Sequence, residues 1–405
     1  MEEWKTYRLG DVCTELSDGL HKAPIFSVNG EYIFVNAKNL SNGWIVDNDS
    51  ERKTTFEEYL KYQVPLNEYS ILYSIDGTIG NIAKYRGEKC ILGKGACYIN
   101  PDPLIINRDY LYYILQSTHF RKYIDNMATG STIQHISLHT MRDYVFMAPS
   151  IEQQKKIASV LTSIDNKIDT NNRINHNLEE QAQALYKSWF VDFEPFKDGK
   201  FIESELGMIP EGWSIRKAEE FCEINIGKTP PRKEHQWFSN EGSDVTWISI
   251  SDMGASGMYI SRSSEMLTKE ACKKFNIIVV PEGTVLLSFK LTVGRVSIAS
   301  KDLTSNEAIA RFLAPSDAMR FYLYLALKLY DYSKLGSTSS IATAVNSKII
   351  KGMPLTCPPT DVLKRFGEQV KGMFNSIKTL QEEISCLCEQ RDSLLQRLMS
   401  GELTC

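Results

Sequence analysis

The chain has 405 residues, which is enough for two or three domains that each have a hydrophobic core. Hydrophobic residues make up 42% of the sequence and charged residues 24%, as is typical of globular proteins. The formal net charge of −4 provides no overall attraction to nucleic acid, so any DNA contact must come from local patches. No apolar run approaches the roughly 20 residues of a membrane span, and the first residues lack a signal pattern, so we expect a cytoplasmic protein without membrane contact.

The nine cysteines do not indicate a disulfide framework or a zinc site, because their number is odd and no two are spaced as CxxC. Cys386 and Cys388 lie two residues apart in a helical pattern and therefore point to different faces of a helix. We expect reduced thiols and no bound metal ion.

Residues 1–150 are predicted to form a mixed α/β domain. The run 69–83 is typical of a strand, a turn and a second strand, with the turn at Asp76 and Gly77. A helix is expected over residues 109–116. The tyrosines of this helix have helical spacing, so we expect them in the core rather than as stacking platforms for bases.

Residues 151–190 have the pattern of a long helix that packs against a partner helix. Apolar positions recur with 4-3-4-3 spacing from Ile157 to Trp189. Asn171 and Asn175 fall on this stripe, where polar residues tend to fix the register of paired helices. The stretch from Ile157 to Trp189 would span about 50 Å at ~1.5 Å per residue. This helix is therefore long enough to act as a spacer.

Residues 191–212 form a linker, because proline and glycine interrupt the helical pattern repeatedly. The aromatic residues in 188–196 are expected to pack internally, with a docking patch for another protein as the alternative. The sequence then repeats itself: Trp213 matches Trp4 at an offset of 209 residues (213 − 4 = 209).

The second copy predicts another mixed domain over residues 213–359 and another spacer helix over residues 360–405. Residues 360–377 align with residues 151–168 at the same offset of 209. Two copies are too few for a solenoid, so we expect a pseudo-symmetric molecule that does one thing at two places.

One such stripe alone is also typical of a helix that faces a domain core, but the equal spacing of the two stripes predicts that the long helices pack against each other. The chain order is domain, helix, domain, helix, so an antiparallel pair would bring Cys405 back near Met1. The expected fold is α+β, with two pseudo-symmetric mixed α/β domains separated by two long antiparallel coiled-coil-like helices. The predicted seam between the helices consists of Ile157, Leu161, Ile164, Ile168, Leu178, Leu185, Phe366, Val370, Ile377, Leu380, Ile384, Leu387, Leu394 and Leu398.

The chain resembles specificity subunits of type I restriction–modification systems along essentially its whole length. The resemblance is carried by residues 4–12, 149–158, 188–196, 203–213 and 391–403. It implies two target-recognition domains that each read one half of a split site in double-stranded DNA. It also implies that the helices hold these domains apart and dock two methyltransferase subunits, which restriction subunits join in the full complex.

Polar and basic side chains in matching loops of the two halves are the candidates for DNA contact. Loops 130–137 and 336–347 precede the long helices and carry groups suited to base edges, whereas loops 18–24 and 225–233 carry basic residues that suit phosphates. Lys84, Lys290 and Arg295 flank the predicted strand–turn–strand segments of the two halves and could also contact phosphates. Ordinary turns with solvated charges are the alternative, and Arg295 could equally serve a structural carboxylate. The candidates are Lys22, Lys84, Ser131, Thr132, Gln134, His135, Lys228, Thr229, Arg232, Lys233, Lys290, Arg295, Ser337, Thr338 and Asn346.

Catalytic motifs do not stand out in the sequence. The Pro-Pro pairs at 230–231 and 358–359 lack the flanking residues of an adenine methyltransferase loop, and His135 and His139 lack the glutamate of a zinc protease. We therefore expect a non-catalytic subunit without a cofactor or metal, with DNA adenine methyltransferase and endonuclease or translocase activities on other subunits. The alternatives are a DNA-independent scaffold that grips proteins across a helical rod, and an enzyme with an unrecognised site.

Overall fold

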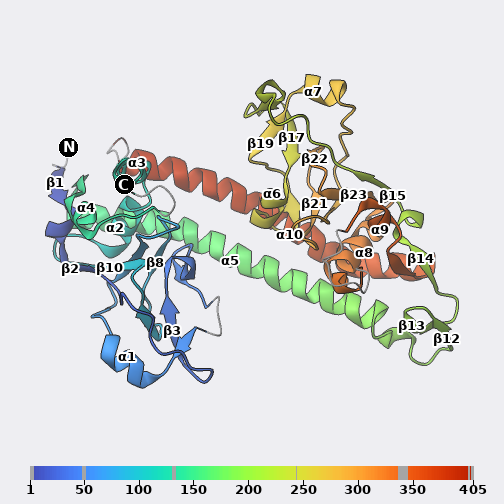
Figure 1. The fold of residues 1–405 in the computed structure, drawn as a ribbon, viewed down its shortest axis with the longest axis horizontal. Coiled ribbons are helices and arrows are strands. Elements are labelled where there is room, and N and C mark those ends of the chain that lie inside the picture. Colours follow the sequence, from blue (N-terminus) through green and yellow to red (C-terminus); the bar gives the residue numbers. More distant parts are fainter. Residues whose placement is uncertain are drawn as a thin grey trace. The chain divides into compact units, whose positions relative to one another are not determined.

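The computed structural model describes residues 4–47, 52–129, 134–242, 244–335, 345–399 and 402. Its helices and strands belong to two compact units (Figure 1). The first unit comprises Met1–Ile168 and Leu387–Cys405, and the second comprises Asp169–Cys386. The boundaries fall inside the two long helices, so each unit combines one mixed domain with one end of each helix.

The first unit is built around a four-stranded antiparallel sheet in the order β2-β10-β7-β8. Both faces of this sheet are covered. Ile71 and Tyr73 pack in the core with the helices, whereas Leu72, between them, packs with the smaller sheet β6-β3-β9. Successive side chains of a strand point to opposite faces, so a strand buried on both faces reads as one apolar run.

The elements of the first unit are β1 (Lys5–Arg8), η1 (Leu9–Val12), β2 (Cys13–Asp18), β3 (Tyr32–Val35), η2 (Ala37–Asn39), β4 (Leu40–Ser41), β5 (Trp44–Ile45), β6 (Lys53–Thr54), α1 (Phe56–Tyr62), β7 (Ile71–Ser74), β8 (Ile82–Lys84), β9 (Cys90–Leu92), β10 (Ala96–Pro101), α2 (Arg108–Ile114), α3 (Thr118–Met127), α4 (Leu138–Asp143) and β11 (Val145–Ala148).

The second unit repeats this plan with a five-stranded sheet, β15-β23-β20-β21-β18, and a smaller sheet, β16-β19-β17-β22. Its elements are η3 (Glu194–Phe196), β12 (Phe201–Ser204), β13 (Gly207–Pro210), β14 (Ser214–Lys217), η4 (Ala218–Glu220), β15 (Glu223–Ile226), η5 (His235–Trp237), β16 (Phe238–Ser239), β17 (Val245–Ile248), α6 (Ile250–Ala255), β18 (Tyr259–Ile260), β19 (Glu265–Leu267), α7 (Lys269–Lys274), β20 (Val285–Ser288), β21 (Val296–Ala299), β22 (Thr304–Ser305), β23 (Ile309–Leu313), α8 (Asp317–Lys328), η6 (Tyr332–Leu335), α9 (Ser347–Lys351) and β24 (Pro354–Cys357).

The duplication extends to the register of the strands. Lys5 pairs with Ala148 between β1 and β11, and Ser214 pairs with Cys357 between β14 and β24, so both partners are shifted by 209 residues (214 − 5 = 209; 357 − 148 = 209). The predicted pseudo-symmetry of the two domains is therefore confirmed.

The long helices α5 (Ile151–Phe190) and α10 (Thr360–Met399) have 40 residues each. In the first unit the start of α5 packs with the end of α10, since Leu161 and Leu398 share one core. In the second unit the end of α5 packs with the start of α10, where the rings of Phe190 and Phe366 lie 4.7 Å apart. The predicted antiparallel orientation is therefore confirmed within each unit.

None of the predicted seam residues is exposed. Burial also extends beyond the stripe: Tyr186 and Phe374 lie off the predicted positions and are buried against the strands and helices of the second domain. The two helices therefore pack against the domain cores as well as against each other, and do not form an isolated two-stranded coiled coil. Met1 and Cys405 lie outside the described residues, but Leu9 and Leu398, near the two ends, share the core of the first unit.

The aromatic residues at the end of α5 pack internally. The ring of Trp213, which opens the second domain, lies 5.7 Å from the ring of Phe190 and 5.1 Å from that of Phe196. The linker is thus fastened to the helix that precedes it.

Asn171 lies fully buried on the helix stripe, and its side-chain amide donates a hydrogen bond to Glu383 at 2.8 Å. Asn171→Ala should lower the free energy of unfolding by about 1–2 kcal/mol relative to Asn172→Ala, because only the first removes a buried hydrogen bond. Asn172 is exposed on the same helix and gains the same helix propensity on substitution. Urea denaturation of the full chain measures the difference, and equal stabilities would contradict a stabilising role for the buried amide.

Candidate nucleic-acid interface

At one edge of the central sheet of the first unit, β2 and β7 end while β8 and β10 begin. We call the segments gathered there, residues 18–22, 75–81, 94–95 and 134–135, the first loop edge. Backbone hydrogen bonds fasten them together: Ile75 donates to Gly95 at 3.1 Å and Gly77 donates to Gln134 at 3.0 Å. The candidates Lys22, Gln134 and His135 all lie on this edge.

His135 is held by a direct contact of its Nδ1 atom with the carboxylate of Asp76, while 41% of its side chain stays exposed. The contact fixes the ring and leaves Nε2 as the nitrogen available to an outside partner. Gln134, beside it, is exposed. The pair presents an imidazole and an amide, groups that suit hydrogen bonding to base edges.

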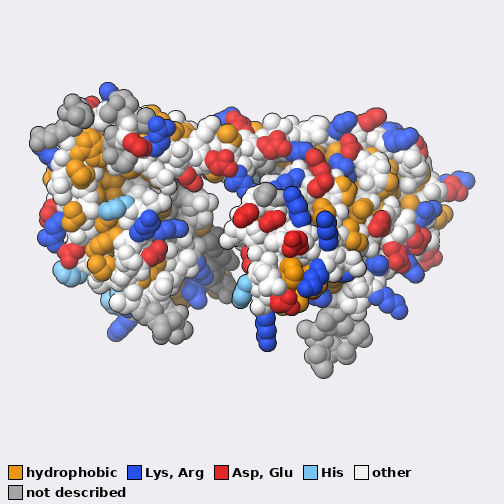
Figure 2. Space-filling view, turned by 90° about the horizontal axis from the view of Figure 1, so that it is seen from above, with side chains coloured by type: hydrophobic (Ala, Val, Ile, Leu, Met, Phe, Trp, Pro, Cys, Tyr) orange, Lys and Arg blue, Asp and Glu red, His pale blue; other side chains and the backbone are white. Residues whose placement is uncertain are grey.

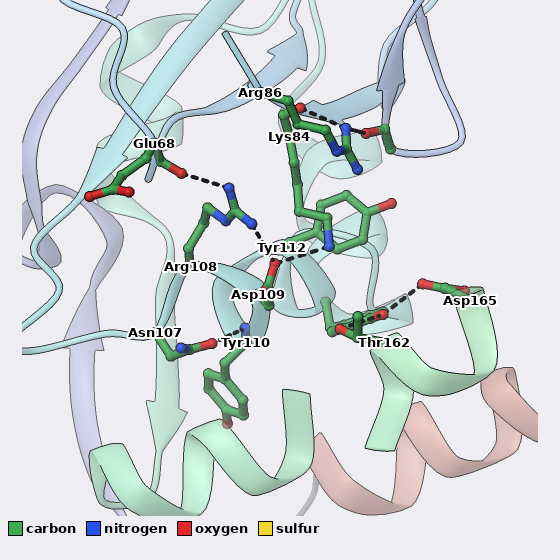
Figure 3. Close-up of polar contacts among 12 residues, drawn as sticks. Glu68, Lys84, Arg86, Asn107, Arg108, Asp109, Tyr110, Tyr112, Thr162 and Asp165 are labelled. Carbon is green, nitrogen blue, oxygen red and sulfur yellow. Dashed lines mark hydrogen bonds and ion pairs between the residues drawn. The ribbon is translucent and has the colours of Figure 1, made fainter. Parts of the chain in front are cut away.

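Lys84 lies at the other end of β8 and is 9% exposed (Figure 3). Its ammonium group lies 3.0 Å from the carboxylate of Asp109 and 4.6 Å from the ring centroid of Tyr112. A buried ammonium group with a carboxylate partner has a structural role, so this placement argues against the predicted phosphate contact.

Asp109 also accepts a hydrogen bond from Arg108 at 3.3 Å. Burial of this carboxyl group raises its pKa. The positive charges of Lys84 and Arg108 and their hydrogen bonds have the larger combined effect, so the pKa of Asp109 lies below its ordinary value. Arg108 in turn donates to the backbone carbonyl of Glu68 at 2.6 Å (Figure 3). This cluster ties α2 to the loop before β7.

In the second unit the equivalent sheet edge is formed where β15 and β20 end and β21 and β23 begin. We call residues 226–233, 289–295 and 306–308 the second loop edge. The candidates in the described part of this edge are Lys228, Thr229, Arg232, Lys233, Lys290 and Arg295. Residues far apart in the sequence are therefore brought to one place by the same sheet topology as in the first unit.

Arg232 is an exposed basic side chain of the second loop edge that has partners within the chain. Its guanidinium group lies 4.6 Å from the ring centroids of both Phe238 and Trp247, and it pairs with Glu265 at 2.7 Å. The hydroxyl of Thr229 likewise donates to the carboxylate of Glu307. These two carboxylates reduce the attraction of the second loop edge for phosphate.

The lysines of the second loop edge are more accessible to an outside partner than Arg232 and Thr229, which contact carboxylates of the chain. Lys228, Lys233 and Lys290 are exposed, and the ammonium group of Lys228 lies 3.1 Å from a backbone carbonyl rather than a carboxylate. Basic and acidic side chains are intermingled on the face shown in Figure 2. The described residues of the face in Figure 2 therefore form no broad basic surface, and the exposed lysines of the second loop edge are separate local charges.

Arg295 has a structural role that its counterpart shares. Its guanidinium group donates to the carbonyl of Ile250 at 2.6 Å, and at the matching position Asn81 donates to the carbonyl of Ala37 at 2.8 Å. The partner of Arg295 is therefore a backbone carbonyl and not the carboxylate considered from the sequence. Arg295 is half-buried, which makes it a weaker candidate for phosphate than the lysines.

Asn346 caps α9: its side-chain oxygen accepts a hydrogen bond from the backbone of Ile349 at 3.0 Å. Ser137, 209 residues earlier (346 − 137 = 209), caps α4 in the same way. The equivalent caps at Asn346 and Ser137 indicate that the side chain of Asn346 has a structural role, which makes it a weaker candidate for a base contact. The remaining candidates, Ser131, Thr132, Ser337 and Thr338, lie outside the described residues.

Arg311 was not predicted from the sequence, yet it holds the first residue of the second loop edge. It is 1% exposed and donates to the carbonyls of Ile226 and Ile278 at 2.9 and 2.8 Å and to the hydroxyl of Thr304 at 3.1 Å. Burial lowers its pKa to about 10. The signal that could have found it is a single charged residue within the apolar run 308–313.

Within the described ranges, no three His, Cys, Asp or Glu side chains come together in a group that could hold a metal ion. Likewise, no helix in the described part of the chain is both long enough and apolar enough to span a membrane.

Two domains of one plan, each with a loop-bearing sheet edge and each built onto both long helices, define a duplicated recognition protein. The model of the type I restriction modification DNA specificity domain family matches residues 1–180 and again residues 210–385. The chain belongs to this family and is a type I specificity subunit with two DNA-recognition domains. Specificity subunits are non-catalytic components of type I systems, and the family match gives no support to a DNA-independent scaffold.

Individual relatives agree with the family match. The type I restriction enzyme HindI specificity subunit of Haemophilus influenzae is 24% identical over 100% of both chains. The MjaIX specificity subunit of Methanocaldococcus jannaschii is 28% identical, over 73% of this chain and 69% of its own. The crystal structure of a type I system S subunit from M. genitalium covers 98% of this chain and 96% of that chain, with a TM-score of 0.58 and 15% identity, and so has the same fold.

The Lys84–Asp109 pair predicts a pH-dependent loss of stability. Because the folded-state pKa of Asp109 is depressed, its contribution is complete above the unfolded pKa of about 3.9 and disappears as pH falls through the folded value. Asp109→Asn should lower the free energy of unfolding at pH 7 by about 1 kcal/mol, after allowance for solvent screening.

The difference from the unmodified protein should shrink as pH falls from 4 towards 2, measured by urea unfolding at each pH. Asp198→Asn, at an exposed carboxylate, is the control and should change little at any pH. A deficit of Asp109→Asn that does not depend on pH would contradict the ionic role of the carboxylate.

Proposed function

We propose that this chain recognises a bipartite site in double-stranded DNA, with one loop edge for each half-site. The observation that carries the proposal is the recurrence of the same loop edge in both units, on equivalent strands but with different side chains. A fixed scaffold with different loops is the arrangement expected of two readers of unlike sequences. The target lies on chromosomal or invading DNA, so we place the protein in the cytoplasm.

In this proposal, different residues contact the phosphates and the base edges. The exposed Lys22, Lys228, Lys233 and Lys290 hold the backbone of the duplex, which positions the protein without reading sequence. Base edges are read by the amide of Gln134, which both donates and accepts, and by Nε2 of His135 on the first loop edge. On the second loop edge they are read by the oxygen of Thr229, which can still accept a hydrogen bond while its hydrogen is donated to Glu307.

The long helices supply the spacing between half-sites and the docking surface for two methyltransferase subunits. A helix of 40 residues is about 60 Å long at ~1.5 Å per residue, whereas one turn of B-DNA is about 34–36 Å. A gap of one turn or somewhat more between the half-sites fits these lengths. Restriction subunits would join the same complex, and the adenine methyltransferase and endonuclease or translocase activities would reside on those partners.

Selection of bound duplexes from a randomised DNA pool by the full-length chain tests the bipartite site. We expect two short defined blocks separated by a gap of constant length. One continuous block would overturn the assignment of one loop edge to each half-site, and the absence of any enrichment would overturn DNA recognition itself.

The lysines of the second loop edge predict a change in the salt dependence of binding. Substitution of Lys228, Lys233 and Lys290 by Gln should weaken binding to all duplexes about equally, because phosphates carry no sequence information. The slope of log K against log salt should become shallower by about 0.9 for each phosphate contact that is lost.

Fluorescence anisotropy with a labelled duplex at several salt concentrations measures this slope. The matched control replaces three exposed lysines of the same unit that lie off the second loop edge, Lys200, Lys217 and Lys301. An equal loss of slope in both variants would show that the effect is one of general charge and not of the second loop edge.

A further inference from the structure

The turn between β20 and β21 holds an unusual leucine at its tip. Leu291 has a φ of 60° and is 99% exposed. The left-handed region is unfavourable for a residue with a side chain, because Cβ approaches the following carbonyl oxygen. An exposed side chain recovers none of this cost through packing within the chain.

The first unit shows what the turn itself requires. Gly77 occupies the equivalent position (291 − 77 = 214) with a φ of 71°. A Cβ placed on Gly77 would meet no atom within 4 Å, so the position is restricted by its backbone conformation and not by space. Glycine adopts this conformation without strain, and the second unit nevertheless carries a leucine.

The two turns are otherwise built alike. The hydroxyl of Ser288 donates to the carbonyl of Thr292 at 2.6 Å and accepts from the backbone of Arg295 at 3.0 Å. The hydroxyl of Ser74 makes the matching bonds, to Thr78 at 2.6 Å and from Asn81 at 2.8 Å. These bonds fix the turn, so the side chain of Leu291 is held outward on a rigid support.

We propose that Leu291 is a specificity contact of the second loop edge that packs against the C5-methyl group of a thymine in the major groove. The inference rests on the proposed function, since it names one base contact of that same loop edge. Lys290 precedes Leu291 and is exposed, so a phosphate contact and an apolar contact stand side by side. The thymine methyl is the apolar group that base edges present in the major groove.

A wedge between base pairs is the other way in which an exposed leucine contacts a duplex. Unstacking a base step costs free energy of the same order as the burial of one leucine side chain returns. Leu291 is flanked by Lys290 and Thr292, and Val293, the next apolar residue, is only 36% exposed. Burial of Leu291 therefore provides no free energy beyond the cost of unstacking, whereas contact with a methyl group requires no deformation of the DNA.

The test compares the full-length chain with Leu291→Gly, which removes the side chain and suits the left-handed backbone. Thermal unfolding should show a midpoint no lower than that of the unmodified protein. Leu104→Gly is the matched control, since Leu104 is 87% exposed and follows β10 at the opposite end of a central sheet. Each protein is first used to select duplexes from a randomised pool.

Each thymine of the half-site that the second unit selects is then replaced in turn by deoxyuridine, which lacks only the methyl group. For one thymine, the replacement should lower the affinity of the unmodified protein about fivefold, the lower end of the usual cost of one mismatched base pair. On thymine DNA, Leu291→Gly should bind with about the same fivefold lower affinity than the unmodified protein. On deoxyuridine DNA the variant should bind no more weakly than it does on thymine DNA, because the substitution and the base replacement remove the same contact. Leu104→Gly should behave as the unmodified protein does.

Two results would overturn the inference while leaving DNA recognition intact. One is selection of the same half-site with undiminished preference by Leu291→Gly. The other is a loss of affinity in this variant that no deoxyuridine replacement reproduces, which would be the result of a wedge or of a contact to the sugar. If the unmodified protein enriches no sequence, the proposed function itself fails.

Discussion

The structure depends on the burial of both long helices in both domain cores. The end of α10 contributes Leu395 and Leu398 to the core of the first unit, and the end of α5 contributes Tyr186 and Phe190 to the core of the second. Each domain therefore completes its hydrophobic core with a helix from the other copy of the repeat. Since apolar burial is the main source of folding free energy, separation of the helices would expose the core of each domain.

The same constraint allows the two domains to diverge at their loop edges. Strand register, helix caps and the serine-held turns are shared by the two copies, so the backbone of each edge is set by interactions that do not involve the tips of the loops. Position 77 is glycine and position 291 is leucine on turns with the same hydrogen bonds. Changes at such positions alter the side chains at the loop edge without altering the scaffold.

Charge alone does not identify the residues that meet DNA. Lys84, Arg295 and Arg311 are basic, but each is committed to acceptors within the chain: the carboxylate of Asp109 for the first, backbone carbonyls for the other two and a hydroxyl in addition for Arg311. In the proposed function, the exposed lysines of the loop edges are the basic residues that remain for phosphate. Position in the fold thus divides the basic residues into those that build the loop edges and those that can bind at them.

The sequence by itself determined the duplication, the two long helices and the mixed domains, because these follow from periodic apolar patterns and from a constant offset, which survive changes in individual residues. It also placed most candidate residues in the loops that form the two edges. Only the tertiary structure decided which of them are available. Long-range pairing of β8 with β7 brings Lys84 to Asp109, and pairing of β15 with β23 puts Arg311 beneath the loop that carries Lys228. Such contacts depend on strand register and burial, which no local pattern of residues encodes.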